Sequence, residues 1–162
     1  MKTGVYPGTF DPVTHGHTDL MVRSLHVFDR LLIAVANNPS KRPLFDVSER
    51  VEMIKLVTRD LPNITVEAFD GLLVDYVRSR GAQAVIRGLR AVSDFEYELQ
   101  MALINRKLEE KFETVFFMPS EEYSYLTSSI VKEVAGHGGD LHAFVHPAIA
   151  ERLRERLRRG RS

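Results

Sequence analysis

The chain has 162 residues, of which 44% are hydrophobic and 27% charged, and its 22 basic residues balance its 22 acidic ones. A net charge of zero creates no global field that would recruit nucleic acid or a membrane surface, and the absence of cysteine excludes disulfides, thiolate catalysis and cysteine-bound metal. No apolar run reaches the length of a signal peptide or a membrane span. We therefore expect a cytoplasmic protein that forms a single domain over residues 1–162.

The first predicted strand, residues 3–6, leads into a Gly- and Pro-rich loop that ends at Gly16 and His17, where a helical pattern over residues 16–28 begins. A helix N-terminus presents unpaired N–H groups and the positive end of a dipole, which favour phosphate. His17 adds a side-chain donor there, unless its ring is only satisfied by a neighbouring carbonyl. Asp11 is expected to shape the loop, with a metal-binding role as the alternative. We interpret this segment as a nucleotide site.

Short β-rich runs alternate with helical patterns along the rest of the chain. The further strands are predicted at residues 31–36, 64–68, 84–86 and 114–117, and the further helices at 48–60, 72–80, 95–111, 127–135 and 147–158. Asp46 and Glu49 form a capping-box pattern at the second helix, and Gly81 is expected to end the third. This alternation predicts an α/β fold with a doubly wound, five-stranded parallel sheet and helices at the C-terminal end.

Ligands of such sheets bind beyond the carboxyl ends of the strands, and four segments follow predicted strands here. These are the first motif, residues 37–44, residues 87–93 and residues 119–129. Lys41 lies in a Pro-rich loop that we do not expect to be helical, while Arg87 and Arg90 flank Gly88 and Leu89. Such cations suit phosphate oxygens, although each could also be a solvated surface side chain. Gly88 would allow the backbone to approach a ligand closely.

Thr127, Ser128 and Ser129 precede Lys132 in the next helix. Their hydroxyl and N–H groups could form a second phosphate cradle, suited to an outgoing pyrophosphate, or simply cap the helix. In these motifs we find no Ser–His–acid set, no paired carboxylates and no covalent nucleophile. This favours a direct in-line displacement at phosphorus, which depends on positioning and charge stabilisation.

Three motifs together resemble the bacterial phosphopantetheine adenylyltransferase family of the nucleotidyltransferase superfamily. They are Thr14-His15-Gly16-His17, Arg87-Gly88-Leu89-Arg90 running into residues 94–98, and the segment from Leu126 to Lys132. The similarity extends over about residues 5–145. It implies a Rossmann-like nucleotidyltransferase fold that transfers AMP from ATP to 4′-phosphopantetheine, giving dephospho-coenzyme A and pyrophosphate. It further implies a homohexamer. From the chemistry we expect Mg²⁺ to arrive with ATP. Because coenzyme A contains the whole product skeleton, we also expect it to bind as a feedback ligand.

The resemblance also implies individual roles. The residues with a catalytic role would be His17, Lys41 and Arg90. The ATP-binding residues would be Thr9, Phe10, His17, Gly88, Leu89, Arg90, Glu98, Tyr123, Ser124, Tyr125, Leu126, Thr127, Ser128 and Ser129. The acceptor-binding residues would be Thr9, Lys41, Leu73 and Arg87, and no residue would be a metal ligand. From its sequence pattern alone, Glu98 could equally be a solvent-facing helical residue.

Two other functions stay open at this point: adenylyl transfer to another acceptor, such as nicotinate mononucleotide, and non-catalytic nucleotide sensing. Residues 71–73 and the apolar stretch from Leu99 to Leu103 favour a pantetheine arm, and the combination of three cations with His17 favours an enzyme. Six arginines crowd the C-terminus: Arg152, Arg154, Arg156, Arg158, Arg159 and Arg161. They are typical of a solvated helix end, with a polyanion-binding patch as the alternative.

Overall fold

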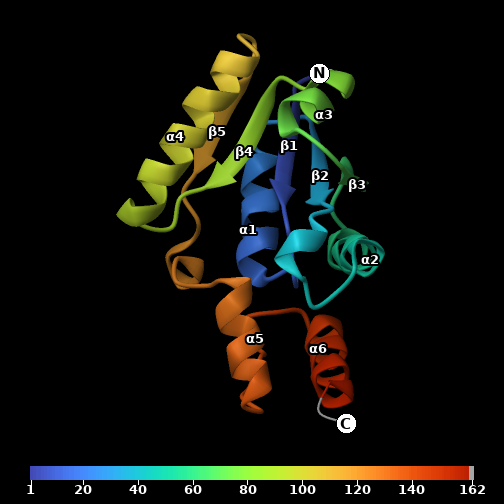
Figure 1. Ribbon diagram of the computed structural model, residues 1–162. Helices are drawn as coiled ribbons and strands as arrows, with labels where there is room; N and C mark the ends of the chain where they lie inside the picture. Colours follow the sequence, from blue (N-terminus) through green and yellow to red (C-terminus); the bar gives the residue numbers. More distant parts are fainter. Residues whose placement is uncertain (161–162) are drawn as a thin grey trace.

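The computed structural model describes residues 1–160, apart from the side chains of residues 92 and 93, and shows a parallel sheet flanked by helices (Figure 1). The strands are β1 (Thr3–Gly8), β2 (Arg30–Ala36), β3 (Ile64–Phe69), β4 (Ala84–Gly88) and β5 (Glu113–Phe117). They form one sheet in the order β3-β2-β1-β4-β5, and every pair is parallel. The predicted fold class is confirmed.

The helices follow the predicted order, with ends that differ by a few residues. They are α1 (His15–Ser24), α2 (Val47–Thr58), α3 (Leu73–Ser79), α4 (Val92–Leu108), α5 (Ser128–Gly136) and α6 (Pro147–Arg159). Helix α1 ends earlier than expected because residues 25–28 form turns that bring Phe28 into the core. The loop around Lys41 contains one 3₁₀ turn, Pro39–Lys41, which was not predicted; a proline at the first helical position is compatible with such a turn.

Two capping predictions are confirmed. Asp46 accepts a hydrogen bond from the Glu49 N–H at 2.8 Å, and the Glu49 carboxylate accepts one from the Asp46 N–H at 2.9 Å. Gly81 lies just past the end of α3 with φ of +59°, a conformation that favours glycine. These local signals fix where α2 begins and where α3 ends.

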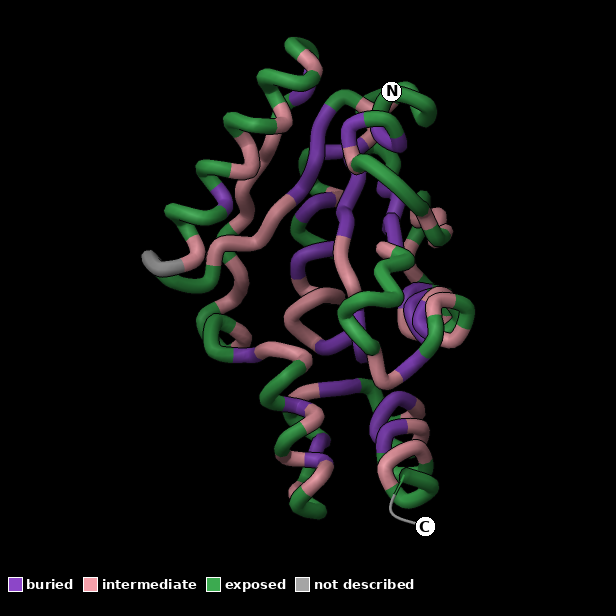
Figure 2. Tube along the Cα trace, viewed as in Figure 1, coloured by how far each residue is buried: buried purple, intermediate pink, exposed green. Residues whose placement is uncertain are grey.

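Apolar side chains cover both faces of the sheet, and the three inner strands β1, β2 and β4 contain its buried residues (Figure 2). Tyr6, Ile33 and Ile86 belong to one core cluster, which also contains residues of α1 and α2. Val5, Leu32, Val85 and residues of α3 form the other core cluster. This double coverage explains why the strands contain uninterrupted apolar runs. Among the described residues, no helix is long and apolar enough to cross a membrane.

Helices α5 and α6 lie beyond the carboxyl ends of the strands, at the end of the molecule toward which the β1 and β2 arrows point (Figure 1). Their apolar side chains, such as Val131 and Leu153, join the same core cluster as α1 and α2. The loops that follow β1 and β2 therefore lie between the sheet and this helical pair (Figure 1).

Candidate active site

A cavity of about 540 Å³ lies at the carboxyl ends of the strands. The sheet order places β1 next to β4, and the chain proceeds from these two strands toward opposite edges of the sheet. Such a switch point is where open α/β sheets bind ligands. Most of the predicted site residues line this cavity: Thr9, Phe10, His17, Lys41, Arg87, Gly88, Arg90, Glu98, Tyr123, Leu126, Thr127, Ser128 and Ser129.

His17 takes part in the cap of α1. Thr14 is the N-cap residue, and its N–H donates to the Nδ1 atom of His17 at 2.9 Å. An Nδ1 atom that accepts this bond carries no proton, so we assign the ring proton to Nε2. The ring does not pair with a neighbouring carbonyl, as the alternative interpretation required. It therefore retains an N–H donor at the start of α1.

His17 is neutral at physiological pH. Burial, and then the positive charge of Arg90, lower the pKa of His17 from 6.5 to about 4. The ring also packs edge-on against Phe10, with 4.9 Å between the ring centroids. The imidazole is thus held in one orientation and one protonation state, and it can donate a hydrogen bond without acting as a base.

Arg87 and Glu98 form a bidentate ion pair across the cavity wall. Arg87 Nη2 and Nε donate to the two carboxylate oxygens at 2.6 and 2.8 Å, and Glu98 is only 8% exposed. Glu98 is therefore not a solvent-facing residue, and its carboxylate contacts Arg87. Asp94 lies one helical turn earlier, where its Oδ2 is 3.4 Å from Arg90 Nε. Two carboxylates thus share this wall, which the sequence did not reveal, but each one faces an arginine.

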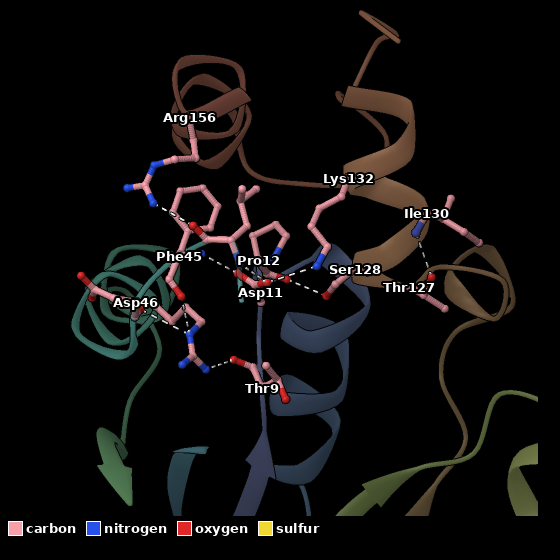
Figure 3. A network of polar contacts seen from close by, with 12 residues as sticks. Thr9, Asp11, Pro12, Phe45, Asp46, Thr127, Ser128, Ile130, Lys132 and Arg156 are labelled. Atoms are coloured by element: carbon pink, nitrogen blue, oxygen red, sulfur yellow. Dashed lines mark hydrogen bonds and ion pairs between the residues drawn. The ribbon is translucent and has the colours of Figure 1, made fainter. Parts of the chain in front are cut away.

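Asp11 connects its own loop to the segment before α2 and to helix α5 through one carboxylate (Figure 3). It is 4% exposed, and its oxygens accept hydrogen bonds from the N–H groups of Leu44 and Phe45 at 2.8 and 2.9 Å. Oδ2 also pairs with Lys132 Nζ at 3.1 Å. The expected loop-shaping role is confirmed. Because both oxygens are engaged, Asp11 is unsuited to the alternative role as a metal ligand.

The start of α5 has features of both a helix cap and a phosphate-binding turn. Thr127 accepts a hydrogen bond from the Ile130 N–H at 3.1 Å, so it is an N-cap, and the Ser128 hydroxyl donates to the Pro12 carbonyl at 2.8 Å (Figure 3). The N–H groups of Ser128 and Ser129 stand in the first turn, where no helical acceptor exists. Both residues line the cavity, so these donors suit a phosphate there.

Three predicted ATP-binding residues do not line the cavity. The Leu89 N–H donates to the Phe117 carbonyl at 3.0 Å, which continues the contact between β4 and β5. The Ser124 hydroxyl donates to the Glu121 carbonyl, and Tyr125 is 57% exposed. Gly88 lines the cavity, but its missing side chain also makes room for Leu20, whose Cδ2 is 3.2 Å from the position a Cβ would take.

A second cavity, of about 300 Å³, adjoins the first. The two share several lining residues: Pro7, Gly8, Thr9, Lys41, Arg87, Tyr97 and Glu98. Leu73 lines the second cavity, as expected of an acceptor-binding residue. Within the apolar stretch from Leu99 to Leu103, Met101 and Ala102 line the cavity together with the following Asn105. The two ends of the stretch, Leu99 and Leu103, lie on the other face of α4 and are 40% and 55% exposed. The spacing of residues 94, 98, 101 and 105 follows one helical face and could have indicated the residues that line the cavity.

Arg156 is the C-terminal arginine with the clearest contacts. Its guanidinium donates to the Leu44 carbonyl at 2.7 Å and pairs with Glu49. It also lies over the Phe45 ring (Figure 3). It therefore joins α6 to the start of α2, which neither interpretation of the arginine cluster anticipated. Arg161 lies outside the described residues.

Residues 5–134 match the model of the cytidylyltransferase-like family. The chain is 54% identical over 160 residues to the phosphopantetheine adenylyltransferase of Caldanaerobacter subterraneus subsp. tengcongensis, covering 99% of this chain and 100% of that protein. It is 52% identical to the enzyme of the same name from Thiobacillus denitrificans, covering 98% and 99%.

Among solved structures, a putative nicotinate-nucleotide adenylyltransferase from Vibrio parahaemolyticus is similar in fold, with a TM-score of 0.69 and 19% identity over 98% of this chain and 96% of that one. A likeness at this low identity supports the fold alone. The identities to full-length relatives decide the family: the chain belongs to the phosphopantetheine adenylyltransferases, within the cytidylyltransferase-like family.

Proposed function

We propose that this protein transfers the adenylyl group of ATP to the phosphate of 4′-phosphopantetheine, giving dephospho-coenzyme A and pyrophosphate. The observation that carries the proposal is the pair of adjoining cavities that share Thr9, Lys41 and Arg87. One cavity has the phosphate-binding features of a nucleotide site. The other is smaller and is lined by residues on successive turns of α4, as suits a site for an extended arm. The shared residues lie where two phosphates would meet.

ATP binds in the larger cavity in this proposal. The neutral His17 donates from Nε2 to the α-phosphate, where charge develops as the transition state forms. Arg90 supplies positive charge beside it, and the N–H groups at the start of α5 receive the outgoing pyrophosphate. Lys132 lines the same cavity and adds a cation at that end.

The acceptor enters through the second cavity, with its arm along Leu73, Met101 and Ala102. Lys41 and Arg87 then bind the acceptor phosphate at the junction. The Arg87 guanidinium contacts Glu98 in the structure, so it would exchange this carboxylate for the acceptor phosphate. Lys41 is exposed and forms no ion pair within the described residues, so its ammonium can follow the phosphate as the bond forms.

The reaction is a single displacement. An oxygen of the acceptor phosphate attacks the α-phosphorus of ATP, the bond from that phosphorus to the bridging oxygen breaks, and pyrophosphate leaves with the electron pair. The attacking oxygen is already ionised, so no general base is required. His17 suits this chemistry because it donates in its neutral form and does not have to exchange a proton.

We propose that Mg²⁺ enters with ATP, bound by phosphate oxygens and water, and that it neutralises charge on the leaving pyrophosphate. Within residues 1–160, no cluster of three or more His, Asp or Glu side chains could hold a metal ion. The donor set of this chain therefore suits a cation held mainly by the nucleotide.

We also propose the homohexamer that the resemblance implies and the feedback by coenzyme A; the cytoplasmic location likewise stays a prediction. An exposed apolar stripe on α4, formed by Phe95, Leu99 and Leu103, supports self-association. Analytical ultracentrifugation tests this directly, and a Leu103→Glu variant should dissociate into smaller species if the stripe is buried between subunits.

The function is tested by an acceptor screen scored by pyrophosphate release. Turnover with 4′-phosphopantetheine and none with nicotinate mononucleotide is expected, whereas the reverse result would transfer the assignment to the other acceptor. Calorimetric binding of ATP without turnover on any acceptor would indicate a nucleotide sensor. As a matched pair, Ala102→Phe should obstruct the second cavity and raise the KM for the acceptor, while Gln100→Phe, at an exposed position of α4 that lines neither cavity, should not.

A further inference from the structure

Arg50 is a buried arginine that the proposed reaction does not use. It lies on α2, is 1% exposed, and forms no ion pair within the described residues. Its Nε donates to the carbonyls of Phe45 and Asp46 at 3.0 and 3.3 Å, and its Nη1 donates to those of Thr9 and Ala36 at 2.7 and 3.1 Å. A buried charge is costly unless hydrogen bonds compensate it, and here four backbone carbonyls do so.

These acceptors come from the segments that border the two cavities. Ala36 is the last residue of β2, and Phe45 directly precedes the cap of α2. The segment between them, residues 37–44, carries Lys41, so one guanidinium binds the carbonyl at each end of the Lys41 loop. The rigid, planar fork of arginine fixes the two ends relative to each other, which a single ammonium could not do.

Thr9 belongs to the turn that faces both cavities. The next residue, Phe10, has φ of +51°, a strained conformation for a bulky side chain that the surroundings must hold in place. In a trans peptide the N–H points away from the carbonyl. Arg50 lines neither cavity, so it binds the Thr9 carbonyl from outside both of them. The Phe10 N–H therefore points away from the Arg50 guanidinium. Figure 3 labels Thr9, Phe45 and Asp46, three of the residues whose carbonyls accept hydrogen bonds from Arg50.

We propose that Arg50 is a positioning residue. It holds the Thr9 turn and the Lys41 loop in the relative position that both need in order to contact the substrates. The kinetic part of this inference rests on the proposed function, whereas the structural part does not. The simpler account is that Arg50 only stabilises the fold. The two accounts predict different catalytic activities for an Arg50 variant that is destabilised as much as a control variant elsewhere in the core.

The test compares Arg50→Met and Arg50→Lys with Ile54→Ala, which removes a fully buried side chain one turn further along α2. Three quantities are measured well below the melting temperature: the Kd for ATP by calorimetry, kcat and KM by pyrophosphate release, and hydrogen–deuterium exchange of residues 9–11 and 37–44. For Arg50→Met we expect faster exchange in both segments, and losses of about tenfold or more in ATP affinity and in kcat, since several bonds to a charged donor disappear.

Ile54→Ala should lower the melting temperature while kcat, the Kd and exchange in both segments stay near wild type. Arg50→Lys should fall between the two, because it keeps the charge and loses the fork. The proposal is overturned if Arg50→Met matches Ile54→Ala in all three measurements. If Arg50→Met does not fold, wild-type kcat and exchange in Arg50→Lys would overturn it equally. If the wild-type protein shows no turnover, but Arg50→Met still speeds hydrogen–deuterium exchange in both segments and weakens ATP binding, only the proposed function is refuted.

Discussion

His17→Ala should reduce kcat far more than it reduces stability. The substitution removes the Nε2 donor and also the hydrogen bond from the Thr14 N–H, which is 2.9 Å long. Loss of such a capping bond costs roughly 0.5–2 kcal/mol, which lowers the melting temperature of a domain of this size by only a few degrees. Loss of one preorganised donor in the transition state costs about 10²–10³ in rate, or roughly 2.7–4 kcal/mol.

The comparison with His17→Gln separates the two effects. Glutamine is a natural residue at the N3 position of a capping box, so its side chain can accept from the Thr14 N–H and keep the start of α1 in place. Its amide NH2 group is also a donor, but it lies on a flexible side chain and is not held in the fixed position of the imidazole Nε2. We therefore expect His17→Gln to recover the melting temperature while its kcat stays at least about tenfold below wild type, since the donor is no longer preorganised.

The assay is pyrophosphate release at saturating ATP and 4′-phosphopantetheine, with the KM for each substrate measured separately. A fall in kcat at an unchanged KM for ATP identifies an interaction made mainly in the transition state. Near-wild-type turnover in His17→Ala would refute the donor role. Full recovery of kcat in His17→Gln would show that the fixed position of the imidazole donor is not required.

The remaining predictions concern charge, pH and ligand. Arg87→Ala, made together with Glu98→Gln so that no buried carboxylate is left unpaired, should raise the KM for 4′-phosphopantetheine by about 10–100-fold and the KM for ATP less; the opposite order would show that we assigned the cation to the wrong substrate. Lys41→Ala should weaken binding of the acceptor and also lower kcat; a change in KM with an unchanged kcat would contradict the role in the transition state. The pKa of His17 is about 4 in the folded protein and 6.5 when unfolded, so the unfolded chain binds more protons between these values and stability falls as pH falls through this window. From pH 7 to pH 5 this amounts to about 2 kcal/mol, measurable by urea unfolding and absent from His17→Gln. Coenzyme A at a hundredfold excess over its Kd should stabilise the protein by roughly 2.7 kcal/mol in a thermal-shift titration; stabilisation by nicotinate mononucleotide in its place would favour the other acceptor.

The sheet and the place of the site could be predicted from the sequence because both follow from local rules. Uninterrupted apolar runs indicate strands that are covered on both sides, and the alternation of strands and helices then dictates a parallel sheet. All carboxyl ends of such a sheet lie at one edge, so His17, Lys41 and Arg90 had to approach one another. The capping pattern at Asp46 is local in the same way, and it is correct.

Predictions that depended on the direction of a side chain were less secure. Helix α4 has apolar residues on both sides, so its apolar residues alone did not show that Met101 and Ala102 face the cavity while Leu99 and Leu103 are exposed. Only their spacing from Asp94 and Glu98 distinguishes the two faces. Arg50 follows Ser48 and Glu49 in what reads as an ordinary polar helix start. Its burial depends on contacts with segments up to 41 residues away, such as the carbonyl of Thr9, which no local pattern encodes.

The charges that line the larger cavity are largely paired with one another. Of the four cations, Arg87 contacts Glu98, Lys132 contacts Asp11, and Arg90 lies at a longer distance from Asp94, which leaves Lys41 as the one cation without an ion pair in the described chain. With His17 neutral, four positive charges oppose three negative ones, so the lining carries a net charge of +1. The carboxylates hold the arginines in extended, ordered conformations, and a phosphate then replaces a carboxylate instead of ordering a mobile side chain. A site with so little excess positive charge cannot neutralise a triphosphate alone, and this is the physical reason to expect the cation to enter with the nucleotide.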